Sequence, residues 1–285
     1  MLDSIINAFT KGDLADLNSK MLHSAYWGQH NAKFYSSEKL NMILGNWFAL
    51  TGKCTVLAHQ TIKQNNHYVV YLTFEPTNKN GTINYVFWLE TNQLMLKSVL
   101  VIVDTVQLAA INQNSPEKVS DNLPSTDPLV ISDYDQQDNL QNDIAWPSNL
   151  IGKQTQNADI LDQWWAIWSQ KQLANINTLY NDDAVINLPG DKHPQKRERL
   201  FDFVLSKINT LTRIFTQLED IAIEGQDVAI KWFLDGDEDE NKIRLPFITL
   251  LKIENNKIIV DTTVCDILAY NKSFSASRVF KQPTA

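Results

Sequence analysis

Apolar residues recur with helical spacing near the N-terminus and again in the second half of the chain. The matching positions, at an offset of 159, are Ile5, Phe9, Leu14 and Leu17 in the first half and Trp164, Trp168, Leu173 and Ile176 in the second. Spacings of three or four residues place side chains on one face of a helix. We therefore predict an amphipathic helix at each place, over 163–179 in the second half, followed there by another helix over 196–211.

After each helical segment the apolar residues alternate with a period of two, which predicts strands. In the second half we predict four strands, at 213–223, 227–234, 243–253 and 257–268. In the first half we also predict four, at 56–62, 68–74, 83–90 and 94–104. Helices followed by consecutive strands predict an α+β fold, with the helices on one face of a curved antiparallel sheet.

The two halves have the pattern of two copies of one unit. Residues 90–97 correspond to 254–261 at an offset of 164, and we assign the five additional residues of the second copy to a hairpin at 235–241. The intervening stretch holds four of the nine prolines and many Asn, Gln, Ser and Asp residues, a composition typical of linkers. We predict a domain at 1–105, a linker at 106–157, a domain at 158–272 and a tail at 273–285.

Composition limits the classes of protein to be considered. A chain of 285 residues, with 44% hydrophobic and 20% charged residues, has the length of two domains and the balance of a globular protein. The net charge of -8 disfavours binding to a nucleic acid backbone. Two distant cysteines, Cys54 and Cys265, form no disulfide framework, and no apolar stretch reaches about 18 residues. We expect a cytoplasmic protein with neither a membrane nor a nucleic acid as its partner.

The order of elements and the last hairpin resemble the SnoaL-like members of the nuclear transport factor 2 (NTF2-like) superfamily. In that family the last hairpin often reads Gly-Lys-Ile-Val-Glu-His-Trp-Asp, and here residues 256–263 read Asn-Lys-Ile-Ile-Val-Asp-Thr-Thr. The resemblance covers roughly 2–105 and 158–270. It implies two cone-shaped α+β barrels, each with a pocket between sheet and helices. It also implies sheet-against-sheet packing as an intrachain pseudo-dimer, with a homodimer as a further arrangement.

The resemblance also directs attention to one carboxylate of the last hairpin. The acid-base Asp of SnoaL-like cyclases falls on Thr263, which cannot abstract a proton at neutral pH, and the neighbouring His position holds Asp261. By strand alternation Asp261 shares a face with Ile259 and Thr263. If that face lines the pocket, apolar surroundings raise the pKa of Asp261 and make it a general base. The alternative is a solvated Asp near a turn; the matched residue of the first copy is Lys97.

Five further residues are candidates for the same pocket, and one of them is Thr263, as a ligand-binding residue on the face of Asp261. Trp168 and Trp232 could form a wall for a flat apolar ligand, or they could pack in the core. His193 lies in a charged run before a helix and is a candidate for hydrogen bonding or proton transfer, whereas the alternative is a solvated helix start. Arg244 could pair with Asp261 or with a ligand carboxylate, or could form a purely structural pair.

These residues favour a protein that binds a small, largely apolar molecule, with the first copy mainly structural. Among such proteins the family includes polyketide cyclases, ketosteroid isomerases and dehydratases, which implies cofactor-independent proton transfer with Asp261 as base and with His193 or a Trp indole N–H helping to hold a developing oxyanion. The alternative is a non-catalytic binding or scaffold module, and a cone filled by tryptophan side chains would favour it. No metal-ligand spacing or nucleotide fingerprint is present, so we expect neither metal nor cofactor.

Overall fold

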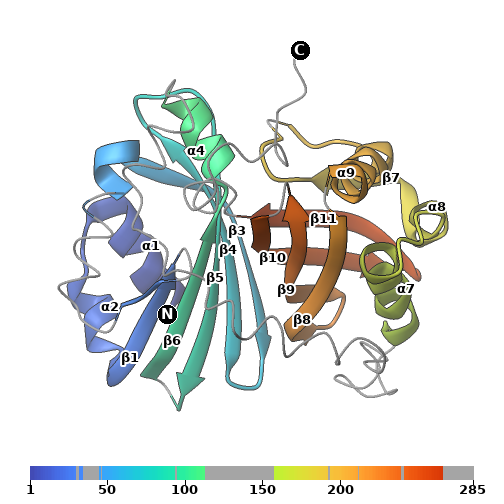
Figure 1. Ribbon diagram of the computed structural model, residues 1–285. Helices are drawn as coiled ribbons and strands as arrows, with labels where there is room; N and C mark the ends of the chain where they lie inside the picture. The colour runs from blue at the N-terminus through green and yellow to red at the C-terminus, as the bar shows by residue number, and fades with distance from the viewer. Residues whose placement is uncertain are drawn as a thin grey trace.

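Two curved sheets face each other in the middle of the molecule, and helices cover the outer face of each (Figure 1). The computed structural model describes residues 1–29, 32–34, 45, 47–93, 95–112, 157–191, 193–210, 212–238 and 241–265. Each half of the chain therefore forms an α+β unit with its own sheet, which confirms the expected fold class of two cone-like α+β units.

The first unit contains a six-stranded sheet with the order β2-β1-β6-β5-β4-β3. Its elements are α1 (Leu2–Lys11), α2 (Ala15–Ser19), β1 (Met21–Gln29), β2 (Ala32–Phe34), β3 (Cys54–Gln64), β4 (His67–Pro76), β5 (Ile83–Asn92), β6 (Met95–Val103) and α4 (Thr105–Ile111). The buried residues of α4, among them Leu108 and Ala109, join the core of this unit, although α4 extends from 105 into the stretch predicted as a linker. Most of that linker, 113–156, and the tail at 273–285 lie outside the described residues.

The second unit contains a five-stranded sheet with the order β7-β11-β10-β9-β8. Its elements are α7 (Ala158–Ser169), α8 (Asn175–Leu179), β7 (Tyr180–Asn187), α9 (Arg197–Thr210), β8 (Thr212–Glu224), β9 (Asp227–Glu238), β10 (Asn241–Glu254) and β11 (Lys257–Cys265). In both units the strand that follows the first helices pairs parallel with the last strand, β1 with β6 and β7 with β11. The sheets are therefore mixed, whereas the sequence predicted antiparallel ones.

The eight predicted strands and the helix at 196–211 are present within a few residues of their expected ends. A continuous helix over 163–179 is wrong, because α7 ends at Ser169 and α8 begins only at Asn175. Between them Lys171 has a positive φ of 60°, which a right-handed helix does not allow. The sequence analysis also missed β7, in which the polar residues Asn181–Asp183 conceal the alternation of buried Tyr180, Ala184 and Ile186.

The register of the last hairpin corrects the alignment of the two halves. In the first unit the register shifts between Glu90 and Thr91, opposite Ser98 and Leu96. In the second it shifts at the equivalent place, with Lys252 opposite Val260 and Ile253 opposite Ile258. The offset here is 162 and not 164, so the bulge residue Lys97 corresponds to Ile259, and Asp261 corresponds to Val99.

The turn between the first two long strands gives a second offset. Gln64 pairs with His67 and Glu224 with Asp227, an offset of 160. Between β9 and β10, at the predicted hairpin, the second unit therefore has two residues more than the first unit has between β4 and β5, where five were expected. Residues of this hairpin at 239 and 240 lie outside the described range.

With these offsets, the apolar interface between the sheets has the form of a pseudo-dimer interface. The described cluster contains five residues from each sheet, and each residue has its equivalent in the other sheet. The pairs are Ile62 and Ala222, Val69 and Ala229, Val86 and Ile248, Trp88 and Leu250, and Ile102 and Val264. A two-fold interface brings the same patch of both partners together, and this cluster has that property within one chain.

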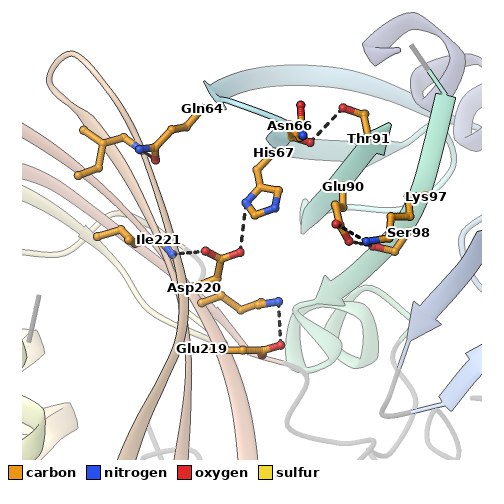
Figure 2. Close-up of polar contacts among 12 residues, drawn as sticks. Gln64, Asn66, His67, Glu90, Thr91, Lys97, Ser98, Glu219, Asp220 and Ile221 are labelled. Carbon is orange, nitrogen blue, oxygen red and sulfur yellow. Dashed lines mark hydrogen bonds and ion pairs between the residues drawn. The ribbon is translucent and has the colours of Figure 1, made fainter. Parts of the chain in front are cut away.

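Hydrogen bonds across the interface repeat the symmetry. The Lys63 backbone N–H donates to Glu224 Oε2 at 2.7 Å, and the Ile223 N–H donates to Gln64 Oε1 at 2.7 Å. Lys63 is equivalent to Ile223 and Gln64 to Glu224, so the two bonds are reciprocal. Figure 2 shows this margin of the interface, where His67 Nδ1 also lies 3.2 Å from Asp220 Oδ2. The expected contact of sheet against sheet is thus present.

Candidate functional site

The carboxylate of Asp261 is buried in the second unit, on the face of β11 that points toward the helices. Asp261 is 1% exposed. Val264, three residues further along β11 and therefore on its other face, lies in the apolar interface with the first sheet. Tyr180 Oη donates a hydrogen bond to Asp261 Oδ2 at 2.5 Å, and Thr263 Oγ1 donates to Oδ1 at 3.1 Å. Both partners are neutral, so this carboxylate is held by hydroxyl groups and not by a cation.

A chain of hydrogen bonds orients the Thr263 hydroxyl. Trp232 Nε1 donates to Thr249 Oγ1 at 3.0 Å, and the two threonine hydroxyls lie 2.9 Å apart. Because Thr263 donates to Asp261 and Thr249 already accepts from Trp232, the consistent direction is from Thr249 to Thr263. The protons along β9, β10 and β11 therefore all point toward the carboxylate, an arrangement in which each polar group is satisfied.

The environment shifts the ionisation of this pair. Burial raises the pKa of Asp261 to about 6, while hydrogen bonds from Tyr180, Thr263 and Trp164 lower it in part. Burial, and then the charge of Asp261, raise the pKa of the Tyr180 hydroxyl well above its ordinary value. A carboxylate with a pKa close to neutrality can accept a proton and release it again at physiological pH, as a general base must.

Aromatic side chains pack at the start of this chain of hydrogen bonds. The Trp232 ring stacks on Phe247 at 4.6 Å between centroids and lies 4.7 Å from Trp168, while Trp164 packs edge-on against Trp232 at 6.0 Å. Trp168 and Trp232 thus pack against each other inside the cone and form no open wall. The indole N–H groups of Trp164 and Trp168 are buried without a hydrogen bond of normal geometry.

Two predicted residues do not join Asp261. His193 is exposed on the β7–α9 loop, where its carbonyl accepts a hydrogen bond from Gln195 Nε2. Arg244 lies on β10 opposite Asp235, seven residues from Leu251, which is the residue paired with Asp261. Seven strand residues span about 23 Å. The backbone at 244 thus lies well away from Asp261, and the Arg244 side chain itself lies outside what the structure describes.

The equivalent positions of the first unit are apolar. By the strand register, Asp261, Thr263, Thr249 and Tyr180 correspond to Val99, Val101, Phe87 and Met21. The interior is occupied by stacked or edge-on rings, including Phe9, Phe74, Tyr85 and Phe87. Lys97, the residue that sequence alignment had matched to Asp261, is instead half-exposed and paired with Glu90 at 2.6 Å.

Sequence reasoning missed Tyr180 and Thr249. Tyr180 begins a strand whose polar second, third and fourth residues hide its period. Thr249 was detectable, because it is the one hydroxyl in the otherwise apolar run 247–251 of a predicted core strand.

A hollow of about 280 Å³ opens between α8 and α9, lined by Ile176, Arg197 and Phe201 among others, and Asp261 does not line it.

Comparison with known protein families gives a match within the second unit. A family model described as a SnoaL-like domain matches residues 161–260, from α7 into β11. The match ends one residue before Asp261. No curated protein sequence matches the chain.

Three solved structures that match this chain each cover less than half of it. IdmH from Streptomyces antibioticus, a candidate polyketide cyclase, is 16% identical over 43% of this chain and 100% of its own, with a TM-score of 0.39. A candidate polyketide cyclase from Bacillus cereus is 21% identical over 40% of this chain and 77% of its own, with a TM-score of 0.37. A Catenulispora acidiphila protein of ketosteroid isomerase-like fold, in complex with trimethylamine, is 15% identical over 44% and 98%, with a TM-score of 0.38.

Among the described residues, no helix is both long enough and apolar enough to cross a bilayer.

Proposed function

We propose that the second unit binds a small, flat, largely apolar molecule that carries a hydroxyl or carbonyl group, and that Asp261 transfers a proton on it without a cofactor. The observation that carries this proposal is a buried carboxylate, held by the hydroxyl groups of Tyr180 and Thr263 and approached by the Trp164 indole, beside an aromatic cluster in which the buried Trp168 N–H has no hydrogen bond. Unpaired buried donors are uncommon in native proteins, and a bound molecule is one way to satisfy them.

Each group has a role suited to proton transfer. Asp261 is the base, since its pKa of about 6 keeps it ionised at neutral pH and still able to take a proton. Tyr180 and the indole N–H groups of Trp164 and Trp168 are donors that could stabilise an oxyanion formed on the ligand. These donors replace His193, which is exposed, as the partners of Asp261 in the proposal.

We further propose that the first unit is a second SnoaL-like copy with a structural role, in keeping with the tandem arrangement inferred from the sequence. The reciprocal bonds and the paired interface residues support a duplication. Because α4 packs on the first sheet, we extend this domain from 105 to 112 and keep the second at 158–272. The apolar replacements at Val99 and Val101 support the loss of its polar site.

The second candidate function is a non-catalytic scaffold. The tryptophan rings that pack around Asp261, and a hollow that does not reach it, favour this alternative. On the first proposal the rings must move when a ligand enters, so intrinsic tryptophan fluorescence should report binding.

Two probes of known chemistry test the proposal. The ketone 2-tetralone has acidic α-protons, and its exchange with D₂O can be followed by NMR; 2-naphthol has the shape of its enol and can be titrated by tryptophan fluorescence. We expect the protein to bind 2-naphthol more tightly than naphthalene and to accelerate exchange. Asp261→Asn should slow exchange by about 10²-fold or more, because it removes the base while keeping the shape.

Thr262→Val is the matched control. Thr262 lies next to Asp261 on β11, on the other face of the strand, and its hydroxyl accepts a hydrogen bond from Asn187 Nδ2. Its exchange rate should equal that of the unmodified protein. Equal exchange rates for Asp261→Asn and the unmodified protein would remove the catalytic assignment. Equal affinities for naphthol and naphthalene would leave the scaffold function in its place.

A further inference from the structure

The first unit contacts the second through α4 and the loop between β7 and α9, which lie at the same end of the molecule (Figure 1). Asp104 is buried at the start of α4, where its Oδ1 accepts the Gln107 N–H at 2.9 Å and caps the helix. Its other oxygen, Oδ2, accepts the backbone N–H of Gly190 in the loop at 2.8 Å. One side chain thus joins a helix of the first unit to a loop of the second.

Gln107 makes a second bond to the same loop. Its Nε2 donates to the carbonyl of Asp191 at 3.1 Å, while its Oε1 accepts the Asn84 N–H of β5 at 2.9 Å. The first sheet therefore fixes the side chain that holds the loop. Asp191 is also held from its own unit, because its Oδ1 accepts from Nε and the terminal NH₂ of Arg199 at 3.2 and 3.1 Å.

The loop approaches α4 so closely that only glycine fits at position 190. Gly190 has a positive φ of 83°, and a Cβ at this position would lie 2.9 Å from Val106 Cγ1. A side chain would therefore meet both an unfavourable backbone conformation and a steric clash.

The same loop closes on the strand beside Asp261. Ile186 of β7 is the register partner of Asp261, and it exchanges two backbone hydrogen bonds with Gln195 at 2.9 and 2.7 Å. Leu188, the second residue after Ile186, is buried in the core cluster that includes Trp164 and Tyr180. The position of this loop therefore affects how well the Asp261 end of the cone is shielded from water.

We propose that Asp104 and Gln107 are positioning residues of the second unit's site: from the first unit they hold the 187–195 loop over the end of the cone where Asp261 lies. The first unit is then part of the site and more than a structural partner. The proposal deepens the proposed function and rests on it only for the effect on ligand binding; the effects on the loop and on Asp261 are measured without a ligand.

Two substitutions in the full-length chain remove the cross-unit bonds. Asp104→Asn leaves a single acceptor oxygen for the N–H groups of Gln107 and Gly190 and removes the charge, so both bonds cannot persist, and Gln107→Glu keeps the acceptor for Asn84 while losing the donor to Asp191. Ile111→Val is the matched control, because it removes one methylene from the packing of α4 without touching the loop. We expect the Gly190 amide to exchange with D₂O at least about 10-fold faster in both variants, and at the unmodified rate in the control.

Site-resolved ¹³C NMR of the Asp261 carboxyl gives the second readout. When the loop is released, water reaches the cone, so the pKa of Asp261 should fall toward its ordinary value in both variants and stay unchanged in Ile111→Val. Unchanged Gly190 exchange would overturn the proposal, and so would faster exchange with an unchanged titration of Asp261. If Asp104→Asn does not fold, the same two measurements on Gln107→Glu alone decide whether the positioning role holds.

The naphthol titration separates this proposal from the proposed function. If the unmodified protein binds 2-naphthol, both variants should bind at least about 10-fold more weakly, and unchanged affinity would contradict the positioning role. If the unmodified protein does not bind 2-naphthol, the proposed function fails, and amide exchange and the Asp261 titration still decide whether the first unit positions the loop.

Discussion

Asp261 shows how one buried residue couples stability to pH. The ordinary pKa of its carboxyl is 3.8, and burial raises this pKa to about 6 in the folded protein. The folded state therefore holds the proton more tightly than the unfolded state. Between about pH 4 and 6 the folded state binds more protons, so the free energy of unfolding decreases as the pH rises through this window.

We predict that Asp261→Asn flattens this dependence. The slope should decrease in magnitude by up to about 1.4 kcal/mol per pH unit, and the effect should amount to about 3 kcal/mol between the two ends of the window. Asp104, whose pKa is also raised to about 6 by burial, contributes a slope of the same sign that remains in this variant. Urea unfolding at several pH values measures the effect.

Thr262→Val serves as the control for this experiment, because it changes the same strand without removing a titratable group. A slope identical in Asp261→Asn and the unmodified protein would show that Asp261 has an ordinary pKa and is therefore hydrated.

At the scale of single elements, the β3–β4 and β8–β9 hairpins build the same turn with different residues. Asn65 has a φ of 52° and its equivalent Gly225 a φ of 62°. In both turns the carbonyl of the next residue accepts a backbone hydrogen bond from the last hairpin. The Asn66 carbonyl accepts from the Thr91 N–H at 2.8 Å, and the Gln226 carbonyl accepts from the Ile253 N–H at 2.9 Å. The left-handed conformation is thus a requirement of the turn, which glycine and asparagine both meet.

We predict that Gly225→Ala lowers the free energy of unfolding by about 1 kcal/mol, because alanine is strained in this conformation. The site is otherwise open, since a Cβ would have no heavy atom within 4 Å, so steric contact adds nothing. Gly225→Asn, which copies the first unit, should cost less than Gly225→Ala. Equal losses for both substitutions in urea unfolding would contradict this account.

For the whole molecule, the interface between the sheets joins the two units into one cooperative structure. Its core consists of equivalent residues from both halves, such as Val86 and Ile248, and each is fully buried. Unfolding of one sheet would expose the apolar face of the other to water. We therefore expect the two units to unfold together.

Ile248→Ala tests this expectation. Removal of buried methyl and methylene groups should lower the free energy of unfolding by about 2 to 5 kcal/mol. Calorimetry should show one transition moving as a whole, although Ile248 belongs to the second unit. Val185→Ala, at a position 38% exposed, should have almost no effect. Two separate transitions, of which only one moves, would show that the units are independent.

The local pattern of the sequence determined the long strands, the helix at 197–210, the two-unit organisation and the expectation that Asp261 faces an apolar interior. These features depend on residues close together in the chain, whose period of two or 3.6 places apolar side chains on one face. The burial of Asp261 and the rise of its pKa agree with that expectation.

Only the tertiary structure decided the register of the hairpins, the parallel strands β1 and β7, and the partners of Asp261. Lys97 and Asp261 were matched by counting residues, but the strand register of the two last hairpins has an offset of 162 and not 164, so Asp261 corresponds to Val99. Tyr180 lies 81 residues before Asp261, and no local pattern joins them. Such contacts depend on how strands pair over long distances, and one residue of slippage exchanges the two faces of a strand.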